Sequence, residues 1–316
     1  MRAPIPHPLL QSPSLTLSPS PFPVVPRVPL VPLVPRVSLD TGPAAPTLVA
    51  VAHGSRDPRA LPAIRALLDR VRALRPGLSV RLGHIELNRP LLADTLRELR
   101  GETVLVPLLF GHGYHVTHDL PAALADAPHL TGRVAEPLGP HALLAEALYG
   151  RLLEAGAASG WGTTAVILAA AGSRAARSAQ DTERTARLLS ARLDGLPVMP
   201  AYAHPSPATT PAGDSPRLRP GGPPSRRPSQ IAAAPTVAEA VRALTARGHQ
   251  RIAVAGCFTA PGHFATQCAA AAPGVAAAPL GDHPALAHLV LHRYDQALVT
   301  RTGSGSESTR AATVAV

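Results

Sequence analysis

Histidine and glutamate side chains stand directly after apolar runs in the first half of the sequence. They are His53 after TLVAVA, Glu86 after SVRLGHI, and His112, His115 and His118 in the loop after TVLVPLLF. Imidazole and carboxylate groups together ligate divalent transition metals, and a neutral imidazole can also accept a proton near pH 7. If the apolar runs are parallel strands, their carboxyl ends share one edge and bring these groups together. An open metal site of this kind is catalytic or transporting, because structural sites saturate their ligands.

Strands and helices are predicted to alternate from residue 46 onward. The apolar runs at 47–52 and 103–110 are short and continuous, as strands buried on both faces are. Leu61, Ile64 and Leu68 recur at helical spacing between the first two strands. Further strands are expected at 79–85 and 134–139, and further helices from Pro90, from about Asp119–Pro121, and over 141–156. This alternation predicts an open parallel α/β sheet.

The pattern then repeats. TTAVILAAAGSR at 163–174 resembles TLVAVAHGSR at an offset of 118, and IAVAGCFTAPGHF at 252–264 resembles VLVPLLFGHGYH at an offset of 149. The difference leaves about 31 extra residues in the second copy, which we place in a disordered Pro/Gly/Ser/Arg-rich insertion at 204–230. The fold class is therefore α/β, with two tandem domains, each a mostly parallel sheet flanked by helices. The expected boundaries are 46–158 for the first domain and 159–300 for the second.

The second copy keeps the turn but loses the candidate ligands. Gly172–Ser173–Arg174 matches Gly54–Ser55–Arg56, whereas Ala171 stands at the position of His53 and Phe264 at that of His115. The Glu86 position falls near His204. We therefore expect one active half, with the other half serving mainly as a wall of the site.

Composition narrows the class of partner. The formal net charge of +10 favours an anionic partner, although every basic residue is Arg, which indicates biased codon usage. The aromatic content of 3% disfavours nucleic-acid binding, since single strands are held by aromatic stacking. Two cysteines fit a reducing cytoplasm, and no apolar run is long enough to span a membrane. Residues 1–45 are expected to form a disordered, polyproline-like extension that can include residues upstream of the true start, and 301–316 a disordered tail.

Each motif also has an ordinary interpretation. A single histidine at a strand end is usually a polar cap, and a single glutamate in a loop is usually solvated. The GSR turn could form a phosphate-binding nest, but it lacks the glycine-rich fingerprints of nucleotide sites. Convergence of three candidate groups at three strand ends favours the metal site over these readings.

Three segments together resemble the sirohydrochlorin chelatases of the short-chain cobalt- and iron-chelatase family. They are HGSRDP at 53–58, the glutamate of IELNRP at 85–90, and VPLLFGHGYHVTHDLP at 106–121. The resemblance covers about 47–298 except the insertion, and it matches the large family members that carry two tandem halves. The resemblance implies ATP-independent insertion of Fe²⁺ (toward sirohaem) or Co²⁺ (toward cobalamin) into sirohydrochlorin, a tetrapyrrole with eight carboxylates.

The resemblance also implies roles for individual residues. His53 and His115 match the family's motif histidines and Glu86, less directly, its carboxylate, so these three are the expected catalytic and metal-binding residues. His112 and His118 match no motif position. Ser55, Arg56 and Arg89 are the expected binding residues for substrate carboxylates. The metal is a substrate and no nucleotide is expected. The protein is expected to be a cytoplasmic monomer or weak oligomer, and the alternative function is a non-catalytic carrier of tetrapyrrole or metal.

Overall fold

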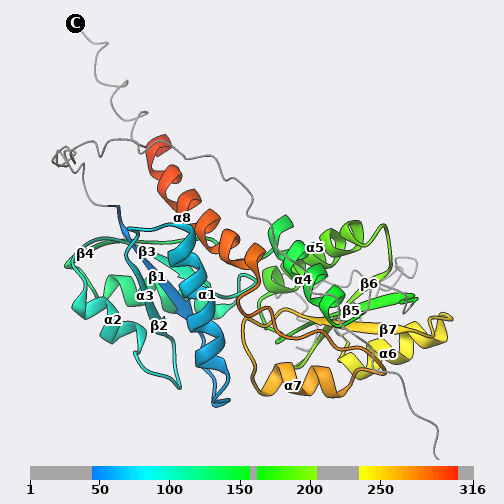
Figure 1. The fold of residues 1–316 in the computed structure, drawn as a ribbon. Coiled ribbons are helices and arrows are strands. Elements are labelled where there is room, and N and C mark those ends of the chain that lie inside the picture. The colour runs from blue at the N-terminus through cyan, green and yellow to red at the C-terminus, as the bar shows by residue number, and fades with distance from the viewer. Residues whose placement is uncertain (1–44, 157–161, 205–234, 305–316) are drawn as a thin grey trace, which may run out of the picture. The chain divides into compact units, whose positions relative to one another are not determined.

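The computed structural model describes residues 45–156, 162–204 and 235–304, called here the first half (45–156) and the second half (162–204 and 235–304) (Figure 1). Each half contains one parallel sheet with helices packed around it. The predicted extension at 1–45, insertion at 204–230 and tail at 301–316 lie, apart from their edge residues, outside the described residues. In the described part of the chain, no helix is both long and apolar enough to cross a bilayer.

The first half has a four-stranded sheet of order β2-β1-β3-β4, in which every pairing is parallel. Its two central strands, β1 and β3, are mostly apolar and buried, as expected for a parallel sheet with helices on both faces. The elements are β1 (Thr47–Ala52), α1 (Ala60–Leu74), β2 (Val80–His84), α2 (Leu92–Glu98), β3 (Gly101–Pro107), the π-helical turn η1 (His115–Asp119), α3 (Leu120–Ala125), β4 (Leu130–Val134) and α4 (Ala142–Glu154).

The second half repeats this order with a three-stranded sheet, β6-β5-β7, again parallel. The elements are β5 (Ala165–Ala170), α5 (Ala176–Arg192), β6 (Val198–Tyr202), α6 (Val237–Ala246), β7 (Ile252–Gly256), α7 (His263–Ala270) and α8 (Pro284–Ser304). The α/β class with two parallel sheets is confirmed, while the exact domain boundaries stay a prediction.

The predicted strand at 134–139 is wrong in position. β4 ends at Val134, where Pro137 and the turn at Gly139 follow, and proline cannot donate to a strand ladder. The corresponding segment of the second half, 272–276, contains Pro273–Gly274 and keeps a single bridge between Val254 and Ala276. Proline and glycine at this position therefore explain why the second sheet has three strands.

Backbone pairing places the extra residues of the second half in two locations. The N–H of His84, at the end of β2, donates to the Pro90 carbonyl. The N–H of Tyr202, at the end of β6, donates to the Pro235 carbonyl in the same way. The stretch from Tyr202 to Pro235 is 27 residues longer than the stretch from His84 to Pro90, and it contains the predicted insertion. The remaining four lie between this point and β7, where α6 spans ten residues and α2 seven.

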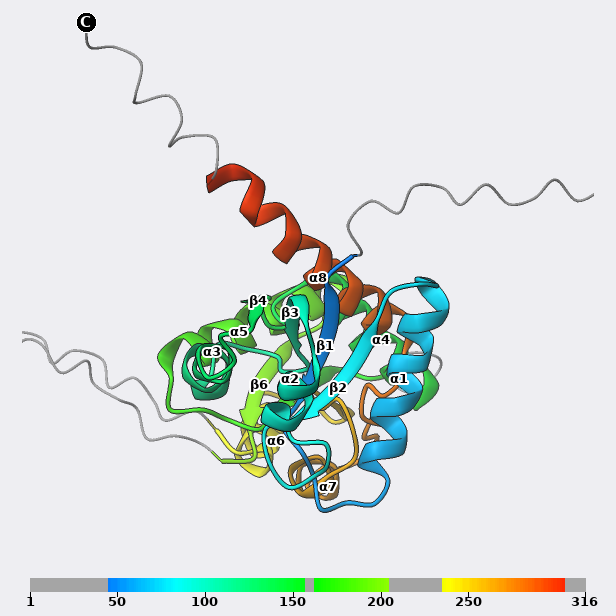
Figure 2. The ribbon, with the colours of Figure 1, turned by 90° about the vertical axis from the view of Figure 1, so that its left-hand side faces the viewer.

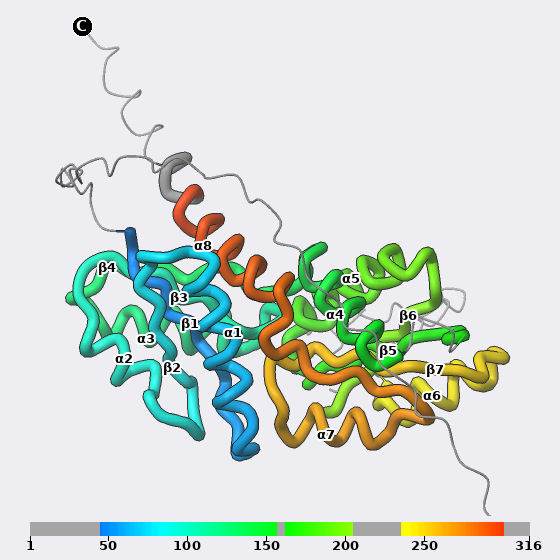
Figure 3. Tube along the Cα trace, in the orientation of Figure 1, coloured from blue at the N-terminus to red at the C-terminus, as the bar shows by residue number. Residues whose placement is uncertain are grey.

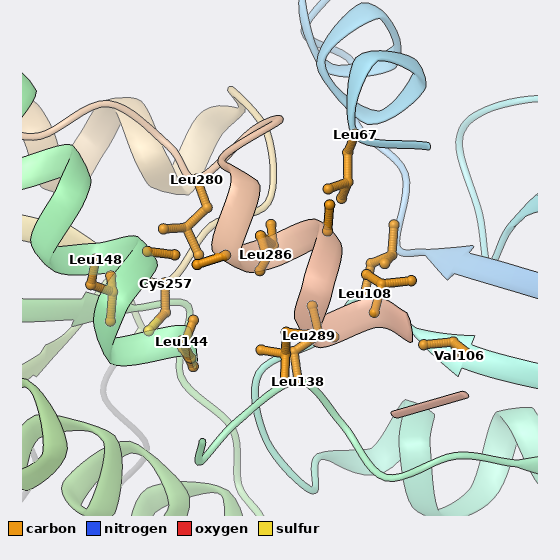
Figure 4. Packing of buried hydrophobic residues seen from close by; sticks show 14 of the residues in the cluster. Leu67, Val106, Leu108, Leu138, Leu144, Leu148, Cys257, Leu280, Leu286 and Leu289 are labelled. Carbon is orange, nitrogen blue, oxygen red and sulfur yellow. The ribbon is translucent and has the colours of Figure 1, made fainter. Parts of the chain in front are cut away.

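The last helix of each half packs across the boundary between the halves. α4 packs against α5 and β7 of the second half, while α8 packs against α1 and β3 of the first (Figures 1 and 3). Figure 2, viewed from the side of the first half, shows α8 beside β1 and β3. One apolar cluster joins the two halves, and Figure 4 shows its centre around α8, with Leu67, Val106 and Leu108 on one side and Leu144, Leu148 and Cys257 on the other.

A buried polar connection also joins the halves. The backbone N–H of His112 and its Nδ1 both hydrogen-bond to Asp181 Oδ2, at 2.9 and 2.7 Å, and its Nε2 lies 2.6 Å from Glu136 Oε2. His112 and Asp181 are 8% and 4% exposed. Asp181 lies on α5 of the second half, so the loop after β3 is attached to the other half of the protein.

The two helices that pack across the boundary, α4 and α8, begin with the same kind of cap. The Nδ1 of His141 accepts the N–H of Leu143 at the start of α4, and the Nδ1 of His283 accepts the N–H of Ala285 at the start of α8. Each ring therefore acts as an N-cap, a role that asparagine fills more often. The His141 ring lies 4.6 Å from that of His292 on α8.

Replacing Asp181 by alanine should destabilise the fold. The change leaves the N–H and imidazole of His112 without their buried acceptor, so we expect the free energy of unfolding to fall by about 3 kcal/mol. Urea denaturation followed by circular dichroism measures this. The exposed Glu98→Ala variant is the control and should change stability by no more than about 0.5 kcal/mol. Equal stability of the two variants would contradict this account of the connection.

The stability of the fold should depend on His141 below neutral pH. Burial, then the nearby Arg293 and His292, lower the pKa of His141 from 6.5 to about 4. As the pH falls through this range the unfolded chain binds a proton that the folded chain does not, so stability is lost. His141→Asn keeps a capping acceptor but cannot titrate. Between pH 7 and 4.5 it should therefore lose less stability than the wild type, by about 1 kcal/mol once partial exposure is allowed for. Urea unfolding at both pH values tests this, with His288→Asn, an exposed position, as control; equal losses would refute it.

Candidate active site

A cavity of about 1410 Å³ lies at the carboxyl ends of the strands and is lined by both halves. The first half contributes the segment from His53 to Asp57, the turn around Glu86, and the loop that carries His115. The second half contributes the turn at 170–175 and the loop at 257–265. The cavity is large enough for a ligand well above metabolite size, since drug-sized pockets span about 300–1,000 Å³.

His53 and His115 meet inside this cavity. Their rings lie edge to face, with centroids 4.8 Å apart and an angle of 85° between the planes. His53 is the residue immediately after β1, and His115 begins the π-helical turn η1 that follows β3. Desolvation and the nearby His115 lower the pKa of His53, against smaller opposing effects of Glu86 and the Gly54 backbone. The neutral form of His53, which has a free lone pair, is therefore favoured at pH 7.

Glu86 approaches His53 from the turn after β2, with 3.5 Å between Glu86 Oε1 and His53 Nδ1. The Glu86 N–H donates to the His53 carbonyl, which ties the turn to the end of β1. Gly54 has φ +109°, and a Cβ there would meet the Glu86 carbonyl oxygen at 1.9 Å. Leu87, at φ +65°, is one of two non-glycine residues with positive φ in the described part of the chain. Such strained positions cluster at functional sites.

Asp119 orients the His115 ring. Its Oδ2 lies 2.5 Å from His115 Nδ1, four residues earlier in the same turn. The carboxylate accepts the Nδ1 proton, so the neutral ring has its lone pair on Nε2, the usual arrangement behind a metal-binding histidine. Isolated π-helical turns also occur frequently at functional sites.

The three residues expected to bind substrate are placed differently. Ser55 and Arg56 line the cavity, whereas Arg89 does not line it and pairs with Asp94 at 2.7 Å. The Ser55 N–H donates to Asn88 Oδ1 at 2.6 Å, and its Oγ accepts from the Asp57 N–H. The Ser55 amide is therefore already bonded, and it does not lie at the N-terminus of α1, which begins only at Ala60.

The other two loop histidines have separate positions. His112 does not line the cavity, since both of its ring nitrogens are bonded to carboxylates in the buried connection described above. His118 lines the cavity and stacks on Tyr114, with centroids 4.5 Å apart and planes 8° apart. Its Nδ1 is 2.8 Å from Thr117 Oγ1.

The second half contains an altered copy of the site. The N–H of His204 donates to the Ala171 carbonyl, as that of Glu86 does to His53, so His204 stands at the Glu86 position. Its ring lies edge to face with Phe264 at 4.9 Å and 88°. The second half therefore retains a ring pair, His204 with Phe264, but the pair of two imidazoles, His53 with His115, is in the first half.

The three expected metal ligands, His53, His115 and Glu86, are not gathered into one closed set. Among the residues that the structure describes, no three His, Cys, Asp or Glu side chains are already grouped to hold a metal ion. The His53–His115 ring pair and the contact of Asp119 with His115 are formed, and Glu86 Oε1 lies 3.5 Å from His53 Nδ1.

Sequence reasoning missed two residues beside this site. Asp119 follows His115 at the i,i+4 spacing that brings side chains together on a helix, so the signal was present in HVTHD. Asp181 gave no such signal, because it lies 69 residues from His112 in sequence and on the other half.

Comparisons with known proteins point to one family. Residues 47–155 match the CbiX family model. A sirohydrochlorin cobaltochelatase of Methanococcoides burtonii is 24% identical over 123 residues, which cover 34% of this chain and 94% of the relative. A sirohydrochlorin cobaltochelatase of Sulfurisphaera tokodaii is 34% identical over 79 residues, which cover 24% of this chain and 66% of the relative.

Solved structures share the fold across both halves. SirB from Bacillus subtilis, determined with Fe³⁺, aligns with a TM-score of 0.58 at 18% identity and covers 82% of this chain and 98% of its own. The sirohydrochlorin chelatase SirB from Bacillus subtilis subspecies spizizenii, in complex with cobalt, gives 0.57 at 17% and covers 82% and 97%. The predicted resemblance is confirmed: the first half of the chain matches the CbiX family model and is similar to sirohydrochlorin cobaltochelatases.

Proposed function

We propose that the protein is a sirohydrochlorin chelatase, which inserts Fe²⁺ or Co²⁺ into sirohydrochlorin without ATP and so supplies sirohaem or cobalamin synthesis. The observation that carries this proposal is the edge-to-face pair of His53 and His115 in a cavity of about 1410 Å³. The match of residues 47–155 to the CbiX family model and the similarity to sirohydrochlorin cobaltochelatases support this reaction, and the structures determined with cobalt and Fe³⁺ support these metals.

The imidazole pair is suited to holding the incoming metal. The lowered pKa of His53 favours a neutral ring that can donate its lone pair. His115, held at Nδ1 by Asp119, offers Nε2. Glu86 adds a negative charge within 3.5 Å of His53 and balances part of the charge of M²⁺. Nitrogen and oxygen ligands of this kind accept several divalent metals, so cellular supply selects between iron and cobalt.

The reaction exchanges one metal ion for two protons. Two pyrrole N–H bonds break, the four ring nitrogens bind M²⁺, and the two protons leave to a base and then to water. A neutral His53 or His115 that has released the metal is free to accept one of them. Glu86 is half exposed and can pass the proton to solvent.

The cavity wall is suited to a polyanionic macrocycle. Arg56 lines the cavity, and no hydrogen bond or ion pair engages it among the described residues. A guanidinium in this state can bind a carboxylate in a bidentate geometry. Ser55 contributes indirectly, because its bonds to Asp57 and Asn88 hold the turn that presents Arg56.

Direct assay of metal insertion tests the proposal. The purified full chain, sirohydrochlorin and Co²⁺ or Fe²⁺ are mixed anaerobically without nucleotide, and the absorption spectrum is followed. We expect metallation well above the protein-free rate. Binding of sirohydrochlorin without faster metallation would instead indicate the carrier function.

His53→Ala and His115→Ala should each lower the metallation rate about 100-fold or more, because each removes one of the two imidazoles that hold metal or accept a proton. Steady-state kinetics with Co²⁺ measure the loss, and circular dichroism shows that the fold survives. The matched control is His288→Ala, an exposed histidine on α8, which should keep the wild-type rate. Wild-type rates in both cavity variants would place the reaction elsewhere.

Asp119→Asn should weaken Co²⁺ binding about tenfold or more, because a neutral amide is a weaker acceptor for the Nδ1 proton of His115 than a carboxylate is. Titration of the Co²⁺ absorption bands in the intact protein measures this affinity. Asp126→Asn, an exposed position just after α3, is the control. Unchanged affinity in Asp119→Asn would show that the contact does not serve the metal.

A further inference from the structure

Each half of the protein places one loop on the GSR turn of the other half. A Cβ at Gly113, in the loop of the first half, would lie 3.4 Å from Ser173 Oγ. A Cβ at Gly262, in the loop of the second half, would lie 3.1 Å from Ser55 Oγ, and Ser55 Oγ donates to the Pro261 carbonyl at 3.4 Å. The two GSR turns therefore stand at equivalent places in the wall of one cavity.

The charged residues of this wall are unevenly paired. Among the described lining residues, the side chains with a full charge are Arg56, Asp57, Glu86 and Arg174. Asp57 is bound by Arg59 at 2.7 Å, and Glu86 faces His53. Neither Arg56 nor Arg174 makes a hydrogen bond or ion pair within the described part of the chain. The unpaired charges of the cavity are thus two guanidinium groups, one from each half.

The second half has kept this arginine while losing the metal-binding groups. Ala171 and Phe264 replace the two histidines, yet the turn Gly172–Ser173–Arg174 is retained with the same geometry. Gly172 has φ +97° beside the His204 carbonyl, and Ser173 Oγ accepts the N–H of Ala175 as Ser55 Oγ accepts that of Asp57. The turn itself needs glycine and serine, but nothing in these contacts needs an arginine side chain at the next position.

We propose that Arg174, in the second half, binds a carboxylate of the macrocycle. Arg174 is the repeat equivalent of Arg56 in the first half. This inference rests on the proposed function and adds a role for the second half, which is substrate recognition. A macrocycle with carboxylates around its perimeter can engage two such groups at once, and each bidentate pair fixes orientation as well as affinity.

Binding of metal-free sirohydrochlorin to the intact protein tests this inference without relying on catalysis. Absorbance titration gives the dissociation constant for the wild type, Arg174→Ala and Arg174→Glu. We expect about tenfold weaker binding in Arg174→Ala and a larger loss in Arg174→Glu, where the new carboxylate repels those of the substrate. Arg174→Lys should recover part of the loss, since it restores the charge but not the bidentate geometry.

The control is Arg184→Glu, which makes the same change in net charge on α5, the helix that begins two residues after Arg174, but outside the cavity. It should bind within twofold of the wild type. Equal weakening by Arg174→Glu and Arg184→Glu would mean that the overall charge attracts the substrate, and would overturn the inference.

Kinetics separate this inference from the proposed function. In the metallation assay, Arg174→Ala should raise the KM for sirohydrochlorin about tenfold and leave the KM for Co²⁺ within twofold. A changed KM for Co²⁺ with unchanged macrocycle binding would overturn the assignment. If the wild type binds sirohydrochlorin but does not metallate it, the proposed function fails while the binding comparison still decides the role of Arg174.

Discussion

The exchange of α4 and α8 across the boundary between the halves is the interaction on which the rest of the structure depends. A parallel sheet must be covered on both faces, and here each half supplies a helix that covers the other. The resulting core is continuous, so neither half can move away without exposing it. Two copies of one fold would otherwise meet as an isologous dimer; in a single chain the same packing is permanent. It fixes the distance between the two sets of loops, and hence the cavity.

Within this near-symmetric frame, the two halves have different duties. The loop that carries His115 is attached through His112 to Asp181, whereas the equivalent positions, Pro261 and Ala63, have no groups that could form such a bond. The second half is therefore more than a wall, as it holds the loop that presents a histidine of the site. Duplication permits this division, because a scaffold that needs only Gly and Ser at its turns can change the neighbouring side chains in one copy.

Local and repeated features were predictable from the sequence, and features that depend on distant contacts were not. Apolar strands, the repeat, and the meeting of His53 with His115 follow from periodicity and from the rule that ligands gather at strand ends. The exchange of helices left no trace in sequence, since an amphipathic helix shows that a face is buried but not against what. The ion pair of Arg89 with Asp94 was not predictable, because a position near the rim does not reveal which neighbour engages the side chain.

For the proposed reaction, a loosely assembled ligand set is an advantage. A chelatase must bind its metal and then give it up, so a site that saturates the metal would oppose the transfer. In this protein one imidazole is held firmly, His115 by Asp119, while Glu86 stands 3.5 Å from His53 on a half-exposed turn. Burial and, after it, the nearby His115 ring lower the pKa of His53 and favour its neutral form without a metal present. The lone pair of His53 can therefore be available for an ion before either substrate arrives.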